Sequence, residues 1–117
     1  MEQAHLDKPG PELDRIIATQ LFGFEVHEEL PIMFETPDSP FVHIPGYSTD
    51  WNGMQLVVEE MQRRGYDFTL KHYEGMVGWW WAATFAKRIN HPITAETAPY
   101  AVCKAAILAL EGQRDET

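Results

Sequence analysis

One segment of the chain, 98–110, is apolar on almost every face of the helix that its composition predicts. Pro99 suits the first turn of that helix, a threonine at position 94 or 97 can cap it, and Gly112 is expected to end it. Lys104 is the one charged side chain of this segment and indicates which side of the helix faces solvent. A helix of this kind cannot lie on a surface, so we expect it deep in the domain with other elements packed around it.

Two further helices are predicted by apolar residues at helical spacing, over 11–21 and 50–64. Pro11 can open the first helix, and the run 48–50 (Ser-Thr-Asp) supplies possible N-caps for the second. Gly23 and Gly65 follow the two patterns, where helices commonly end.

Alternating apolar and polar residues predict a strand at 24–28 and an antiparallel hairpin of 66–73 and 77–86, with its turn at Glu74-Gly75. Four prolines interrupt the segment 31–45. Because proline cannot donate to a strand ladder, 31–36 and 41–44 are expected to be short edge strands or an ordered loop. The order α-β(β)-α-β-β-α predicts an α+β fold, an antiparallel sheet with packed helices.

Length and composition predict one domain. A chain of 117 residues with 44% hydrophobic residues can bury one core. We expect a loose N-terminal arm at 1–10, a globular domain at 11–112 and a polar tail at 113–117. The sequence shows no membrane span and no signal peptide, and Cys103 has no second cysteine with which to pair, so we expect a cytoplasmic protein.

Charge is unevenly distributed along the chain. The formal net charge is −9, and the stretch 16–62 contains no lysine or arginine. Such a one-signed region repels nucleic acid and membranes and favours basic partners. The stretch holds eight acidic residues: Glu25, Glu28, Glu29, Glu35, Asp38, Asp50, Glu59 and Glu60.

The acids near the start of this stretch have two interpretations. One is an ordinary solvated face. The other is an acidic surface that matches a basic groove on a partner, where complementary charge speeds encounter and sets register. In the second interpretation the partner-binding residues are Glu25, Glu28, Glu29, Glu35 and Asp38.

Three consecutive tryptophans lie in the predicted strand 77–86. Side chains alternate between faces, so Trp79 and Trp81 should point one way and Trp80 the other. Either all three belong to a core with helices on both faces of the sheet, or one face is partly open and Trp80, with Tyr73, is a binding anchor.

No metal site, cofactor site or catalytic centre is predicted. The five histidines have no metal-ligand spacing, and no nucleophile motif or phosphate-binding glycine loop occurs. His27 and Glu29 could form an acid–base pair, but catalysis also needs a pocket and a positioned substrate. Direct nucleic-acid binding is disfavoured, because the basic pairs are only Arg63-Arg64 and Lys87-Arg88.

Three segments, 13–27, 48–70 and 95–110, together resemble the phage ABA-sandwich domain family of small phage and prophage proteins. The resemblance lies in Gly23-Phe24, in the Ser-Thr-Asp start and Gly65-Tyr66 end of the middle helix, and in Thr97-Ala98-Pro99 before the last helix. It implies an α/β/α sandwich and brings no catalytic residues. The acidic, proline-rich insert 25–45 and the tryptophan triplet depart from the family pattern.

A phage origin favours a role in binding and disabling a host protein. We therefore expect a non-enzymatic accessory protein that inhibits or modulates a host protein with a basic surface, such as a nucleic-acid-binding defence factor, in the host cytoplasm. One alternative is a binder that sequesters a nucleotide signal between subunits, for which local bases would be needed. A phage assembly component is another, and exposed aromatic strand residues would also be compatible with a homodimer.

Overall fold

The computed structural model describes residues 8–27, 29–34, 36, 38–76, 78–86 and 92–115, with only the backbone at 112–115. Its helical segments are α1 (Pro11–Ile16), the π-helical turn η2 (Ile17–Leu21), α2 (Trp51–Arg63) and α3 (Ala98–Asp115). Its strands are β1 (Glu25–Val26), β2 (Ile32–Phe34), β3 (Val42–His43), β4 (Asp67–Gly75), β5 (Gly78–Ala86) and β6 (Ile93–Ala95).

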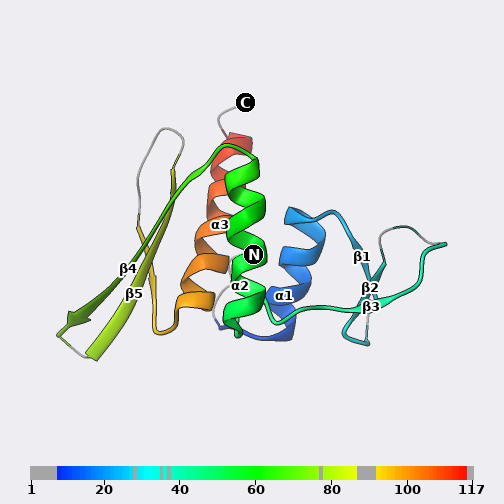
Figure 1. Ribbon diagram of the computed structural model, residues 1–117, viewed down its shortest axis with the longest axis horizontal. Helices are drawn as coiled ribbons and strands as arrows, with labels where there is room; N and C mark the ends of the chain where they lie inside the picture. The colour runs from blue at the N-terminus through cyan, green and yellow to red at the C-terminus, as the bar shows by residue number, and fades with distance from the viewer. Residues whose placement is uncertain are drawn as a thin grey trace.

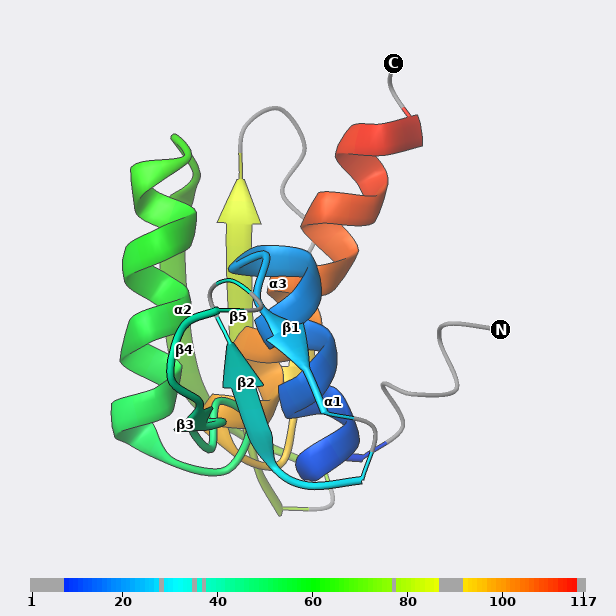
Figure 2. The same ribbon diagram turned by 90° about the vertical axis from the view of Figure 1, so that its right-hand side faces the viewer.

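The strands form two antiparallel sheets, which we name sheet A (order β1-β2-β3) and sheet B (order β4-β5-β6). Figure 1 shows the two sheets at opposite ends of the long axis with the helices between them. Figure 2 looks along that axis, with sheet A in front and the β4–β5 hairpin behind the helices. The predicted α+β class with antiparallel strands and packed helices is confirmed, and the structure adds the division into two sheets.

The last helix lies in the core, as its composition predicted. α3 packs against β5, β6 and α2. Its alanines and other small side chains are buried, which lets neighbouring backbones approach closely: Ala98, Ala101, Val102, Cys103, Ala105 and Ala106. Thr97 is the capping threonine, since its hydroxyl accepts a hydrogen bond from the Tyr100 amide at 3.4 Å. The expected end at Gly112 is wrong, because the helix continues to Asp115.

The first two helices lie where they were predicted. Asp50 caps α2 by accepting a hydrogen bond from the Asn52 amide at 3.2 Å. The first helical segment covers 11–21, but its last five residues are π-helical, which the spacing of apolar residues did not reveal. Arg64, just after α2, donates to the Leu21 carbonyl at 2.5 Å and so satisfies a carbonyl at the end of η2.

The hairpin forms with a turn displaced by two residues. Gly75 pairs with Gly78, so the chain reverses beyond the predicted Glu74-Gly75. Gly78 has a φ of +126°, which favours glycine there. Strand β6 was not predicted, and Thr94 belongs to it instead of capping the last helix. Strands at the predicted 24–28, 31–36 and 41–44 all form, although each is shorter.

One hydrophobic core joins the helices with both sheets, from Met33 of sheet A to Phe85 of sheet B. At the N-terminal side, the Gly10 amide donates to the Ser48 hydroxyl at 2.9 Å. Residues 1–7 of the predicted arm and 116–117 of the predicted tail lie outside the described residues, so the domain bounds stay a prediction. Within the described part of the chain, no helix combines the length and hydropathy needed to cross a membrane.

Candidate functional site

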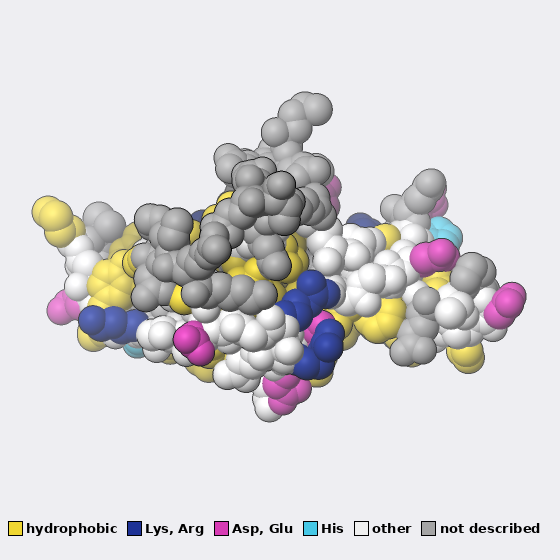
Figure 3. All heavy atoms as spheres, turned by 90° about the horizontal axis from the view of Figure 1, so that it is seen from above, with side chains coloured by type: hydrophobic (Ala, Val, Ile, Leu, Met, Phe, Trp, Pro, Cys, Tyr) yellow, Lys and Arg dark blue, Asp and Glu magenta, His cyan; other side chains and the backbone are white. Residues whose placement is uncertain are grey.

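The predicted partner-binding acids that the structure describes all belong to sheet A or its connections. Glu25 lies in β1, Glu29 in the turn between β1 and β2, and Asp38 in the loop before β3, and all three are exposed. Glu28 and Glu35 lie outside the described residues. Figure 3 shows acidic side chains spread over this end of the molecule, separated by uncharged surface.

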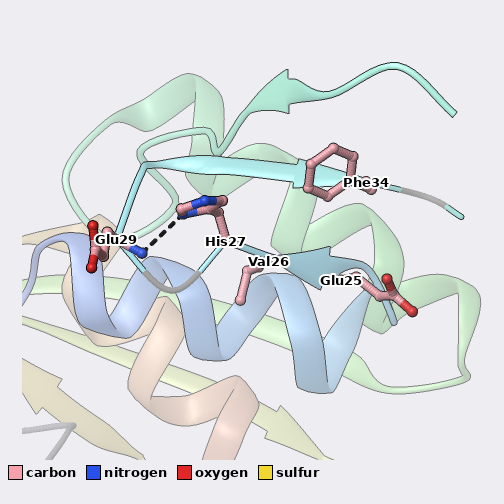
Figure 4. Close-up of a pocket in the computed structure, with 5 residues that line it drawn as sticks. All are labelled: Glu25, Val26, His27, Glu29 and Phe34. Atoms are coloured by element: carbon pink, nitrogen blue, oxygen red, sulfur yellow. Dashed lines mark hydrogen bonds between the residues drawn. The ribbon is translucent and has the colours of Figure 1, made fainter. Parts of the chain in front are cut away.

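The outward face of sheet A contains a shallow hollow of about 460 Å³. Glu25 lies opposite Phe34 in the strand register, and Val26 lies opposite Met33. Because Met33 is buried against the helices, Glu25 and Phe34 occupy the face that points away from them. Figure 4 shows Glu25 and Glu29 at opposite ends of the hollow, with His27 between them.

His27 holds the turn between β1 and β2. Its Nδ1 accepts hydrogen bonds from the backbone amides of Glu29 and Leu30, each at 3.0 Å. This arrangement selects the tautomer with the proton on Nε2. His27 therefore contacts Glu29 through the backbone amide, and the suggested acid–base pair with its carboxylate is not what the structure shows.

A cation that sequence reasoning missed lies beside this surface. Arg15 of α1 donates from Nη2 to the Glu29 carbonyl at 3.2 Å, and its buried Nε has no hydrogen-bond partner among the described residues. Arg15 directly precedes the stretch without bases, but the fold returns the β1–β2 turn to it. Its proximity reduces the negative field at the Glu29 end of the hollow more than at the Glu25 end.

Other acids of the stretch have structural roles on α2. Asp50 is its N-cap, and Glu59 accepts a hydrogen bond from Gln55 at 3.2 Å. Glu60 pairs with Arg63 at 2.5 Å and Arg64 at 3.0 Å. The Arg63 hydrogen bond is the largest of the interactions that lower the pKa of Glu60 from 4.5 to about 2. Within the described residues, Glu25, Glu29 and Asp38 form no ion pair, and the same holds for Asp50 and Glu59 elsewhere in the stretch.

Large apolar side chains are exposed on and beside sheet A. Leu30, Phe41 and Val42 expose 52%, 58% and 53% of their surface. Contiguous exposed apolar side chains can mark a surface that binds another protein. The sequence predicted short strands here but could not show which of their apolar side chains stay exposed.

The tryptophan triplet is not a buried core, so the interpretation that places all three inside is wrong. Trp79 is 59% exposed, and Trp80 and Trp81 are half-buried. Trp81 faces the helices and meets the Trp51 ring edge-on at 5.5 Å. Trp80 lies on the other face, which no helix among the described residues covers (Figure 1).

Trp80 has close neighbours on that outer face of sheet B. It lies opposite Tyr73 in the register. Its indole also covers Gly75, since a Cβ on that glycine would lie 3.0 Å from Trp80 Cδ1. Sheet B and sheet A lie at opposite ends of a molecule 48 Å long, so Trp80 and the acidic surface do not form one site.

The described residues contain no group of three or more histidine, cysteine, aspartate or glutamate side chains placed to hold a metal ion. His91, one of the five histidines, lies outside them.

The model of the family described as Phage ABA sandwich domain matches residues 15–107. The crystal structure of a phage protein from Bacillus cereus ATCC 14579 is similar, with a TM-score of 0.71 and 23% sequence identity. The match covers 90% of this chain and 91% of that one, and at this identity it shows a shared fold. No match is found among curated proteins.

Proposed function

The chain belongs to the phage ABA sandwich domain family, and from that premise we propose a non-enzymatic phage or prophage accessory protein that binds a host protein. The bound host protein has a basic surface and is inhibited or modulated by the contact, in the host cytoplasm. An anti-CRISPR-like action on a nucleic-acid-binding defence factor is the form of this proposal that the charge favours.

The observation that carries the proposal is the combination of charges and apolar groups on sheet A. Glu25, Glu29 and Asp38 are exposed and form no ion pair among the described residues. Leu30, Phe41 and Val42 are exposed at the same end of the molecule, with Val42 on the Met33 face of sheet A, opposite to Glu25. Apolar area supplies affinity when it is buried, and the acids supply fast encounter and orientation with a cationic partner.

A nucleic-acid-binding protein suits this surface because its own groove must be rich in lysine and arginine to bind phosphates. Carboxylates presented on a rigid scaffold can occupy such a groove in place of the nucleic acid. The proposed action requires only binding.

The alternative of a nucleotide-sequestering protein has less support. Among the described residues, the hollow on sheet A is lined by two carboxylates and no lysine or arginine, which disfavours a phosphate group. Arg63 and Arg64 are already paired with Glu60, and Lys87 and Arg88 lie outside the described residues. No described feature favours a phage assembly component.

The test is a pull-down from host lysate followed by affinity measurements on the captured protein at several salt concentrations. We expect one basic protein, released by salt. Replacing Glu28, Glu29, Glu35 and Asp38 together by their amides should weaken its binding and flatten the salt dependence.

A matched control neutralises acids on or near sheet B, the exposed Asp67, Glu74 and Glu96, together with the exposed Glu59 of α2. This variant has the same net charge as the test variant but keeps the acids of sheet A, so it should bind nearly as the native protein does. An affinity that does not respond to salt, or equal losses in both variants, would refute a specific acidic docking surface.

A further inference from the structure

The hollow of sheet A is lined by both acidic and aromatic side chains, and this combination restricts the ligands that fit it more than the negative charge alone does. Glu25 and Phe34 are direct cross-strand partners on the outward face, which places a carboxylate beside an aromatic ring. Val26 also lines the hollow, but its side chain shares the inward face with Met33 and packs against the core. A complementary ligand must therefore offer a positive charge and a flat surface for the ring.

The other polar groups of the hollow indicate where in it a positively charged ligand group would bind. His27 has its Nδ1 engaged by two backbone amides, so it cannot accept a further hydrogen bond through that atom. At the Glu29 end, Arg15 already donates to the backbone carbonyl. The Glu25 end is thus the better place for an incoming cation, since no described cation bonds to it.

We propose that the hollow receives an arginine side chain of the partner, with the guanidinium paired to Glu25 and stacked on Phe34. This inference rests on the proposed function and adds the chemistry of the side chain that anchors the partner. Arginine fits better than lysine because its planar head can bond a carboxylate through two N–H groups while it stacks on an aromatic ring.

The experiment needs no knowledge of the host target. Blocked tripeptides Gly-Arg-Gly, Gly-Lys-Gly and Gly-citrulline-Gly are titrated into the isotope-labelled full chain, and backbone amide shifts are followed by NMR. Citrulline keeps the shape of arginine without its charge. We expect saturable shifts over residues 25–34 with the arginine peptide, smaller ones with lysine and none with citrulline.

Two variants and two matched controls locate the interaction. Glu25→Gln should weaken binding of the arginine peptide by up to about fivefold, the upper end of the range for an exposed ion pair. Phe34→Leu should weaken it to a similar extent by removing the ring. Asp67→Asn removes an acid from sheet B, and Trp79→Leu removes an exposed ring from sheet B, so both should bind the peptide as the native chain does.

Equal shifts with citrulline, or shifts confined to other parts of the chain, would overturn the inference. Equal affinity for lysine would overturn the preference for arginine. Suppose that the variant with Glu28, Glu29, Glu35 and Asp38 neutralised loses the host protein, while the native chain shows no saturable binding of the arginine peptide. This result would reject the arginine site in the hollow and leave the proposed function standing. Saturable binding of the arginine peptide without any captured basic protein would support the arginine site and count against the proposed function.

Discussion

At the scale of single residues, Asp14 and Ser48 form the buried polar contact of this fold. Asp14 accepts hydrogen bonds from the Ser48 amide at 2.8 Å and from its hydroxyl at 2.7 Å. Burial raises the pKa of Asp14, while the two hydrogen bonds from Ser48 oppose that rise. The contact joins α1 to the turn that leads into α2, so it stabilises the arrangement of two helices.

We predict that Ser48→Ala lowers the free energy of unfolding by about 1–3 kcal/mol, because it leaves a buried acceptor with one hydrogen bond fewer. Urea denaturation followed by circular dichroism measures the change. Thr49→Ala, at the exposed neighbouring position, should change stability much less. A Ser48→Ala variant as stable as the native chain would show that Asp14 needs no second donor.

Glu60 gives a prediction that depends on pH. Its folded pKa of about 2 lies below the ordinary value of 4.5 for a glutamate, so its pairing with the two arginines stabilises the fold above pH 4.5. That contribution is lost as the pH falls from about 4.5 towards 2. Because the Glu60 side chain keeps some solvent contact and its partner Arg63 is largely exposed, we expect Glu60→Gln to cost only about 1 kcal/mol at pH 7.

The measurement for Glu60 is the difference in unfolding free energy between native and variant chains at a series of pH values. It should shrink towards zero on acidification. Glu59→Gln is the control, since Glu59 bonds only to the neutral Gln55 among the described residues. A difference that stays constant with pH would mean that the ion pairs contribute nothing.

At the scale of elements, α2 shows why a glycine can be required inside a helix. A Cβ on Gly53 would lie 2.5 Å from the Gly46 carbonyl oxygen and 2.8 Å from the Tyr47 amide nitrogen, both of them backbone atoms. By intrinsic propensity alone, a glycine at this position would weaken the first turn of the helix. In the structure it is the residue that allows the 46–50 turn to pass close to the helix.

We therefore predict that Gly53→Ala destabilises the chain by about 1–3 kcal/mol, the range for overpacking, although alanine is the better helix former. Thermal unfolding measures the effect. Gln55→Ala, at an exposed position of the same helix, should be close to neutral. A higher melting temperature for Gly53→Ala would show that the turn can move away without cost.

The helices and strands were predicted well where their signals are local. The Asp50 cap and the apolar stripe that includes Met54, Val57 and Met61 fall within a few turns of α2, so the sequence located the helix to within one residue at each end. β6 has only three residues and forms by pairing with β5, as in Trp81 with Ala95. A three-residue strand that forms by pairing with a neighbouring strand is too short to show a clear alternation of apolar and polar residues in the sequence.

At the scale of the whole molecule, the main finding is the separation of two surfaces. The acidic surface of sheet A and the outer face of sheet B, with Tyr73 and Trp80, lie at opposite ends of the 48 Å axis. Sequence reasoning grouped Trp80 with the acids as partner-binding residues. The two surfaces are therefore too far apart to act as one site, and the homodimer that the aromatic strand residues suggest stays a prediction, which Trp80 on the outer face of sheet B can test.

We predict that Trp80→Ala weakens self-association about fivefold or more, as loss of an interface tryptophan commonly does. Capture of the basic host protein should be unchanged, because the acidic surface lies at the other end. Sedimentation equilibrium and the pull-down measure the two properties. Trp51→Ala serves as the control. It removes another exposed tryptophan, which begins α2 and contacts Trp81 on the helix-facing side of sheet B.

A Trp80→Ala variant that loses the host protein but keeps its oligomeric state would contradict this division of surfaces. A native chain that remains monomeric at high concentration would contradict the expected homodimer.

The sequence by itself determined the helices, most strands, the α+β class and the stretch in which acids outnumber bases. These features depend on periodicity, capping and composition, which act between residues a few positions apart. The tertiary structure alone decided that the strands divide into two sheets, that Arg15 lies beside Glu29, that Asp14 meets Ser48, and that Trp80 lies far from the acids. Such contacts join residues distant in the chain, and they form only when the helices pack into one core and carry their flanking segments with them.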